Sequence, residues 1–183
     1  RYVIASAEGR SNGDYAGMVG KQSALCKYGE NAYQAPAALF DTETNDPLAL
    51  SAFQVIEGTP PSYKNWCDID RLLQTATHIA AGFDTNRGKV PFMAIGVKHG
   101  NACGAAVGEN AEEVLRNMLA GDPLSIFGGL VLANFPIDDE CSEVLAGKML
   151  DGVIAPSFTE GARDRLRRKG DRCRFIENPA LGA

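Results

Sequence analysis

The sequence has no long hydrophobic run and no excess of positive charge. No apolar stretch approaches the roughly 20 residues that span a bilayer, and the chain does not open with the charged and then apolar segments of a signal peptide. The formal net charge is −5 and the pI is about 5.1, which argues against nucleic acid as a general partner. We therefore expect a soluble, cytoplasmic protein that binds neither membranes nor nucleic acid.

Histidine is scarce, and the cysteines are not paired in sequence. The chain has two histidines and five cysteines, with no CxxC pair among them. A zinc deaminase would show HxE followed by PCxxC, whereas Gly100 and Asn101 follow His99. The glycine-rich phosphate-binding patterns GxxxxGK[ST] and GxGxxG are absent as well. We therefore expect free thiols, no zinc and no metal site.

What the sequence does contain is an alternation of strand-like and helix-like segments. Its 183 residues are enough for one substantial hydrophobic core. Strands separated by helices predict a largely parallel sheet with helices on both faces, which is an α/β fold with three α/β/α layers. A glycine, Gly82, should end the first helix, and the basic residues 163–169 should form a solvated face. The expected strands are 50–56, 91–97, 126–133 and 152–156, and the expected helices are 68–81, 110–119, 137–150 and 159–169.

The pair Lys98-His99 is the first chemical signal. It stands where the apolar run 91–97 gives way to a segment of small residues, 100–106, which we interpret as a loop. The carboxyl ends of strands in α/β sheets carry ligand-binding residues, which would place the pair at the mouth of a cleft. An imidazole exchanges a proton near neutral pH, and a neighbouring ammonium stabilises a developing negative charge. Taken alone, the dipeptide is weak evidence, because most neighbouring Lys-His pairs are surface residues.

Four segments in order resemble a known family. Residues 25–34, LCKYGENAYQ, are similar to its LRYGENPHQ, and residues 97–106, VKHGNACGAA, to its VKHANPCGVA. Residues 122–129, DPLSIFGG, are similar to DPxSAFGG, and residues 151–158, DGVIAPSF, to DGIIAPxF. The family is that of 5-aminoimidazole-4-carboxamide ribonucleotide (AICAR) transformylase, the formyltransferase part of a bifunctional purine enzyme.

The resemblance implies a fold and an organisation. The family's transformylase region has two cytidine-deaminase-like subdomains without zinc and works as a homodimer with shared active sites. This sequence resembles only the first subdomain, and neither the second nor the preceding cyclohydrolase domain has a counterpart. We divide the chain into an N-terminal extension or linker, 1–22, and a transformylase-like subdomain, 23–183.

The resemblance also implies ligands and residue roles. The substrate would be the AICAR nucleotide, and the co-substrate 10-formyltetrahydrofolate. A homodimer, or a chain that supplies the second subdomain, would be the partner. His99 would remove a proton from the AICAR amine as it attacks the formyl group. Lys98 would stabilise the charge on the tetrahedral intermediate or assist the transfer of protons. The substrate-binding residues would be Lys27, Tyr28, Asn101, Phe127, Gly128 and Asp151.

Some positions depart from the family pattern. Lys27 replaces an arginine and offers a point charge in place of a planar, two-pronged donor for phosphate. Ala102 replaces a proline and removes a rigid turn beside the candidate pair. Structural alternatives also stand: Tyr28 and Phe127 as core residues, Gly128 at a bulge and Asp151 in a turn. Two further functions therefore remain open, namely a nucleotide-binding or regulatory module without catalysis and a structural subunit that pairs with another chain.

Overall fold

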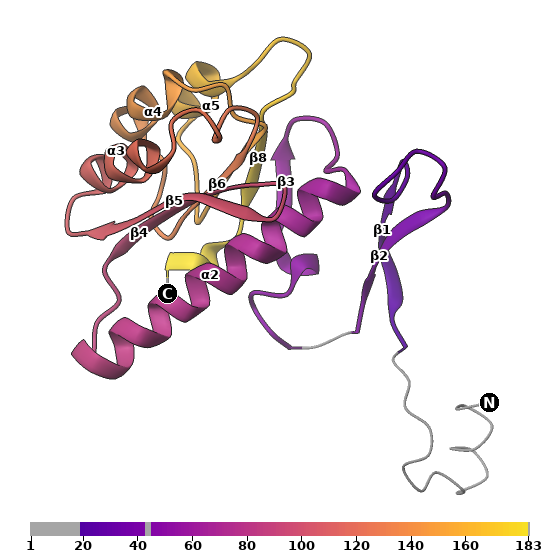
Figure 1. Cartoon of the computed structure of the whole chain (residues 1–183), viewed down its shortest axis with the longest axis horizontal. Helices are drawn as coiled ribbons and strands as arrows, with labels where there is room; N and C mark the ends of the chain where they lie inside the picture. Colours follow the sequence, from indigo (N-terminus) through magenta and orange to yellow (C-terminus); the bar gives the residue numbers. More distant parts are fainter. Residues whose placement is uncertain (1–18, 43–44, 183) are drawn as a thin grey trace, which may run out of the picture.

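The computed structural model describes residues 19–42 and 45–182, and a six-stranded sheet lies at its centre (Figure 1). The strand order is β3-β8-β7-β6-β4-β5, and β1 and β2 form a separate two-stranded sheet. The strands are β1 Lys21–Cys26, β2 Ala37–Asp41, β3 Gln54–Glu57, β4 Phe92–Lys98, β5 Asn101–Gly108, β6 Leu130–Ala133, β7 Gly152–Ala155 and β8 Arg174–Glu177. The helices are α2 Tyr63–Arg87, α3 Ala111–Gly121, α4 Asp139–Ala146 and α5 Glu160–Leu166, with short 3₁₀ helices at Leu50–Ala52 and Pro179–Gly182.

Helices cover both faces of the sheet, which confirms the predicted three-layer α/β/α architecture. The long helix α2 lies on one face, and α3, α4 and α5 lie on the other (Figure 1). The alternation of side chains along β4 separates the two cores, as the twofold period of a strand requires. Ile95 and Val97 pack in the cluster with α2, whereas Ala94 packs in the cluster with α3.

The sheet is mixed, so the prediction of a largely parallel sheet was wrong. β6, β7 and β8 are parallel, whereas β4 is antiparallel to both β5 and β6, and β3 is antiparallel to β8. The segment 100–106 was expected to be a loop, but all of it after Gly100 belongs to β5. A two-residue connection joins β4 to β5, and such a short connection allows only antiparallel pairing. Glycine and alanine have little strand propensity, so the pattern of β5 gave no strand signal.

Helix α2 is longer than its sequence pattern indicated. It begins after Ser62, whose hydroxyl accepts a hydrogen bond from the Asn65 backbone N–H in a capping box. It passes through Gly82 and ends at Gly88, which adopts the left-handed conformation with a φ of 63°. The predicted stop at Gly82 was wrong, because a glycine inside a helix costs only about 1 kcal/mol and ends it only where a left-handed turn follows.

Other helix and strand boundaries also differ from the predicted ones. The expected strand 50–56 is a 3₁₀ turn followed by β3, and the expected strand 126–133 contains turns before β6. Helices 137–150 and 159–169 shorten to α4 and α5. Helix α5 begins after Thr159, whose hydroxyl caps it by accepting a hydrogen bond from the Ala162 N–H. Part of the expected extension, residues 1–18, lies outside the described residues, and β1 begins at Lys21.

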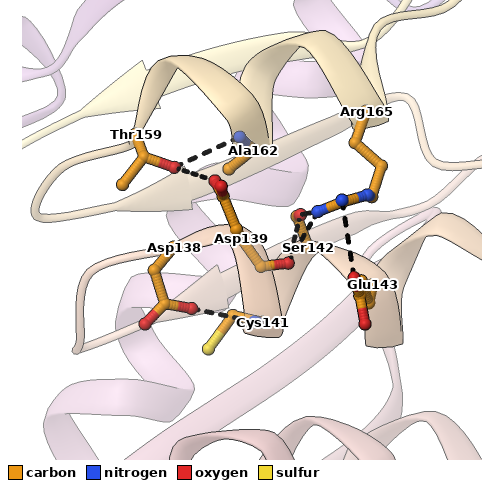
Figure 2. Close-up of polar contacts among 8 residues, drawn as sticks. All are labelled: Asp138, Asp139, Cys141, Ser142, Glu143, Thr159, Ala162 and Arg165. Atoms are coloured by element: carbon orange, nitrogen blue, oxygen red, sulfur yellow. Dashed lines mark hydrogen bonds and ion pairs between the residues drawn. The ribbon is translucent and has the colours of Figure 1, made fainter.

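The basic residues around α5 are only partly the solvated face that was expected: Arg165, Arg167 and Lys169 are exposed, whereas Arg163 and Arg168 are half-buried. Arg163 and Arg167 both bind the Glu57 carboxylate of β3. Arg165 reaches across to α4, where it donates to the Asp139 carbonyl and the Ser142 hydroxyl, both at 2.8 Å (Figure 2). Partners far away in sequence decide these contacts, so local charge patterning could not reveal them.

Two buried thiols make the stability of the fold sensitive to alkaline pH. Burial is the main cause that raises the pKa of both Cys141 and Cys173 from 9.0 to about 12. The folded thiols therefore stay neutral where unfolded ones ionise, so the free energy of unfolding should fall as pH rises from about 9 towards 12. We expect urea midpoints to fall over this range. Replacing both thiols with alanine should flatten the profile, and an unchanged slope would contradict the assignment.

Candidate active site

Lys98 ends β4 on the sheet face that carries α3. Its half-buried side chain donates a hydrogen bond from Nζ to the Phe127 carbonyl oxygen at 2.5 Å. The same Nζ lies 5.9 Å from the centroid of the Phe127 ring, within the range of a cation–π contact. An ammonium has three N–H donors, so this contact orients the group and leaves two donors for a ligand.

His99 and Gly100 form the two-residue turn between β4 and β5. Their φ values are 53° and 74°, and positive φ at both central residues is typical of a type I′ hairpin turn. The Gly100 N–H donates to Oδ1 of Asp68, a buried carboxylate on α2, at 2.7 Å. The Asn101 side-chain amide donates to the His99 carbonyl at 3.0 Å.

The His99 ring itself is exposed. Among the described residues, none forms a hydrogen bond or an ion pair with it. The turn therefore has a defined backbone and an imidazole that is accessible to a ligand.

Phe127 and Gly128 lie in the turn that precedes β6. Gly128 has a φ of 73°, a conformation that side chains rarely adopt, and its N–H donates to the Met149 carbonyl at 2.7 Å. The Phe127 side chain is 56% exposed, so it is not a core residue. The exposed Phe127 ring and the Gly128 backbone, which carries no side chain, therefore lie beside the Lys98 ammonium.

Asp151 lies directly before β7 and next to Gly128. A Cβ placed on Gly128 would be 3.9 Å from Asp151 Oδ1. That oxygen accepts a hydrogen bond from Arg168 Nη1 at 3.0 Å, in an ion pair. In the described part of the chain, the other carboxylate oxygen, Oδ2, has no such partner and is available to a ligand.

Antiparallel pairing of β4 with β6 brings these segments together. Val97 is opposite Leu130, and Leu130 is opposite Gly152, so Lys98 and Asp151 lie at one edge of the sheet. This edge combines the carboxyl end of β4 with the amino ends of β6 and β7. Lys98 lies at the carboxyl end of its strand as expected, and the amino ends of β6 and β7 supply the rest of the site.

Lys27 and Tyr28 lie on a different element, in the turn after β1. The Lys27 Nζ is 6.0 Å from the Tyr28 ring centroid, and Tyr28 is 37% exposed, so it is not a core residue. No hydrogen bond or ion pair among the described residues joins either one to the Lys98 cluster. The preceding residue, Cys26, lines a cavity of about 370 Å³ together with Trp66 of α2 and Gly100. The β1–β2 hairpin thus shares a cavity with the His99–Gly100 turn.

Sequence reasoning missed two contributors. Asp68 anchors the His99–Gly100 turn, and its only signal was an acidic residue at the start of the predicted helix. Arg168 binds Asp151, but its basic neighbours made it look like a surface charge.

Two kinds of feature are absent from the part of the chain that the structure describes. In residues 19–42 and 45–182, no three His, Cys, Asp or Glu side chains are grouped so that they could hold a metal ion. Within the same ranges, no helix is both long enough and apolar enough to cross a bilayer.

Two solved structures align with part of the chain at low sequence identity. RibD from Acinetobacter baumannii aligns with a TM-score of 0.46 and 14% identity, over 64% of this chain and 37% of that one. The dCMP deaminase of cyanophage S-TIM5 aligns with a TM-score of 0.38 and 16% identity, over 56% of this chain and 97% of that one.

Curated relatives match at higher identity. The bifunctional purine biosynthesis protein PurH of Anoxybacillus flavithermus is 39% identical over 152 residues, which is 83% of this chain and 27% of that protein. PurH of Parvibaculum lavamentivorans is 36% identical over 87% of this chain and 28% of its own length. The chain thus spans little more than a quarter of these relatives. The family described as the AICARFT/IMPCHase bienzyme matches residues 3–181, and the chain belongs to this family.

Proposed function

We propose that this chain is part of an enzyme that transfers a formyl group from 10-formyltetrahydrofolate to the 5-amino group of AICAR. The observation that carries the proposal is the meeting of Lys98, Phe127-Gly128 and Asp151 at one edge of the sheet. These residues come from three of the four sequence segments that match the family, and they are far apart in the chain. A shared ligand would explain why the matching segments converge.

The reaction requires proton removal from a weak nucleophile. The amine nitrogen of AICAR attacks the formyl carbon, a tetrahedral intermediate forms, and the bond from that carbon to the folate nitrogen then breaks. In this proposal the His99 imidazole takes the amine proton, which contributes on the order of 10²–10⁴-fold in general, and the imidazolium then returns that proton to the folate nitrogen as it leaves. The two remaining N–H donors of Lys98 stabilise the negative charge on the intermediate oxygen.

The nucleotide would lie along the same edge. The half-buried backbone at Gly128, which carries no side chain, allows a flat heterocycle to approach, and the free Oδ2 of Asp151 accepts a hydrogen bond from it. Lys27 on the hairpin would contribute a positive charge to the phosphate. Arg168, bound to the other Asp151 oxygen, would keep that carboxylate oriented.

Binding of AICAR tests this arrangement. We expect Asp151→Ala and Lys27→Ala each to weaken AICAR affinity by about tenfold or more in calorimetry, since a hydrogen bond to a charged group is worth about 1.5–3 kcal/mol. Matched controls are Lys89→Ala and Glu109→Ala, an exposed ion pair of 2.9 Å at the other end of the β4–β5 hairpin. Unchanged affinity in both site variants would contradict the substrate assignment.

A second candidate function is nucleotide binding without catalysis. It is favoured by the length of the match, because the chain covers only 27–28% of the two relatives described above. Suppose that the isolated chain binds AICAR without formyl transfer and that a second chain restores turnover. This result would support a subunit that needs a partner. Binding with no turnover under either condition would support the module.

A further inference from the structure

A cavity of about 610 Å³ lies between the C-terminal ends of α4 and α5 and carries an unusual concentration of positive charge. No aspartate or glutamate lines it. Its other lining residues are apolar or glycine. The cationic residues of this basic cavity are Lys148, Arg165, Arg167, Arg168, Lys169 and Arg172.

Composition does not explain the charge of the basic cavity. The chain as a whole carries a formal charge of −5, with 18 lysines and arginines against 23 aspartates and glutamates. Like charges crowded around one hollow repel one another, at a cost that surface screening only partly removes. The C-terminal ends of helices offset a small part of this cost through their partial negative charge. An anion bound inside the basic cavity would offset far more of this repulsion.

Half of the cations are held in place by carboxylates outside the basic cavity. Arg165 pairs with Glu143 and is further fixed by α4, as Figure 2 shows. Arg167 pairs with Glu57, and Arg168 pairs with Asp151. These contacts orient the guanidinium groups in advance, so a ligand would not have to order them.

The other cations have no such neutralising partner. In the described ranges, no carboxylate lies within ion-pair distance of Lys148, Lys169 or Arg172. Lys148 donates only to the Pro123 carbonyl, at 3.2 Å. Three positive charges without a carboxylate partner therefore line the basic cavity. The other three cations that line it are already held in place by their ion pairs.

We propose that the basic cavity binds a small molecule that carries two or more phosphate groups. Three uncompensated cations match a multivalent anion better than a single phosphate. The volume lies within the range of about 300–1,000 Å³ that is usual for small-molecule sites. Met149 and Leu166 add apolar surface for an organic portion. A single hollow of this size on an acidic chain favours such a metabolite over nucleic acid, which is read by an extended basic face.

The basic cavity shares two residues with the candidate active site. Arg168 lines the cavity and binds Asp151, and Met149 lines it and accepts the hydrogen bond from Gly128. A bound polyphosphate would compete with Asp151 for Arg168. This link rests on the proposed function, whereas polyphosphate binding itself does not.

Calorimetry of the full chain with inorganic triphosphate tests the proposal. The parent should bind triphosphate more tightly than monophosphate, and affinity should fall as salt rises. The double variant Lys169→Ala/Arg172→Ala removes two side chains that form no ion pair within the described residues. Its affinity for triphosphate should fall at least tenfold. The matched control Arg87→Ala/Lys89→Ala removes two exposed charges beyond the cavity and should bind as the parent does.

Three outcomes would overturn the proposal. They are no binding of triphosphate by the parent, equal losses in the test and control variants, and tighter binding of a single-stranded RNA oligonucleotide than of triphosphate at the same salt. AICAR affinity is measured separately with and without triphosphate. If triphosphate binds as expected and AICAR does not bind at all, the proposed function fails while the basic cavity stands.

Discussion

Replacing His99 with asparagine is expected to lower formyl transfer by about 10²–10⁴-fold, the usual contribution of a general base. AICAR affinity should change little, because the imidazole acts on the amine proton in the transition state and does not hold the nucleotide. The measurement is turnover with AICAR and 10-formyltetrahydrofolate, alone and with any chain that restores activity, beside calorimetry of AICAR binding. A drop in turnover with unchanged affinity is the signature of a base.

Asparagine is chosen because His99 occupies a left-handed turn position with a φ of 53°. Asparagine tolerates this conformation better than most residues, and Asn-Gly is the preferred pair for such a turn. The substitution should therefore keep or slightly raise the thermal midpoint. His99→Ala removes the same ring but adds backbone strain, so it should lose turnover and some stability together. Turnover within threefold of the parent in the asparagine variant would rule out His99 as the base.

Replacing Gly104 with alanine is expected to lower the free energy of unfolding more than any other substitution predicted in this chain. A Cβ at this position in β5 would lie 2.0 Å from the Met118 carbonyl oxygen, and that oxygen belongs to the backbone of α3. Neither element can move away easily, because a Cβ at Gly121 on the same helix would in turn meet the Gly104 Cα at 2.8 Å. Overpacking of this kind costs about 3 kcal/mol or more. At roughly 2–4 °C per kcal/mol for a chain of this size, the thermal midpoint should fall by about 6–12 °C.

Gly82→Ala is the matched control. Gly82 lies inside α2, and no atom beyond its own helix lies within 4 Å of an added Cβ. Alanine there should stabilise the fold by about 0.5–1 kcal/mol, because glycine loses more conformational freedom on folding. Calorimetric unfolding of both variants gives the contrast. Similar midpoints for the two would show that β5 and α3 are not in the close contact described here.

Much of the candidate site could be predicted from short motifs. Lys98, Phe127, Gly128 and Asp151 all come from segments that resemble the family, and the fold brings them to one sheet edge. Lys27 and Tyr28 come from such a segment too, yet they lie on the separate hairpin. Motif order says nothing about how a two-stranded sheet sits beside the main one, because that depends on packing between elements.

The sequence by itself determined which segments are buried and where several helices begin. Hydrophobic periodicity and caps such as Thr159 act within a few residues, so they are legible locally. Only the tertiary structure decided that β4 turns back into β5, that Arg168 binds Asp151, and that Glu57 binds Arg167. Each of these contacts joins atoms that folding brings together from distant parts of the chain. A local sequence pattern cannot reveal them, because it does not contain the energy of contacts between distant residues.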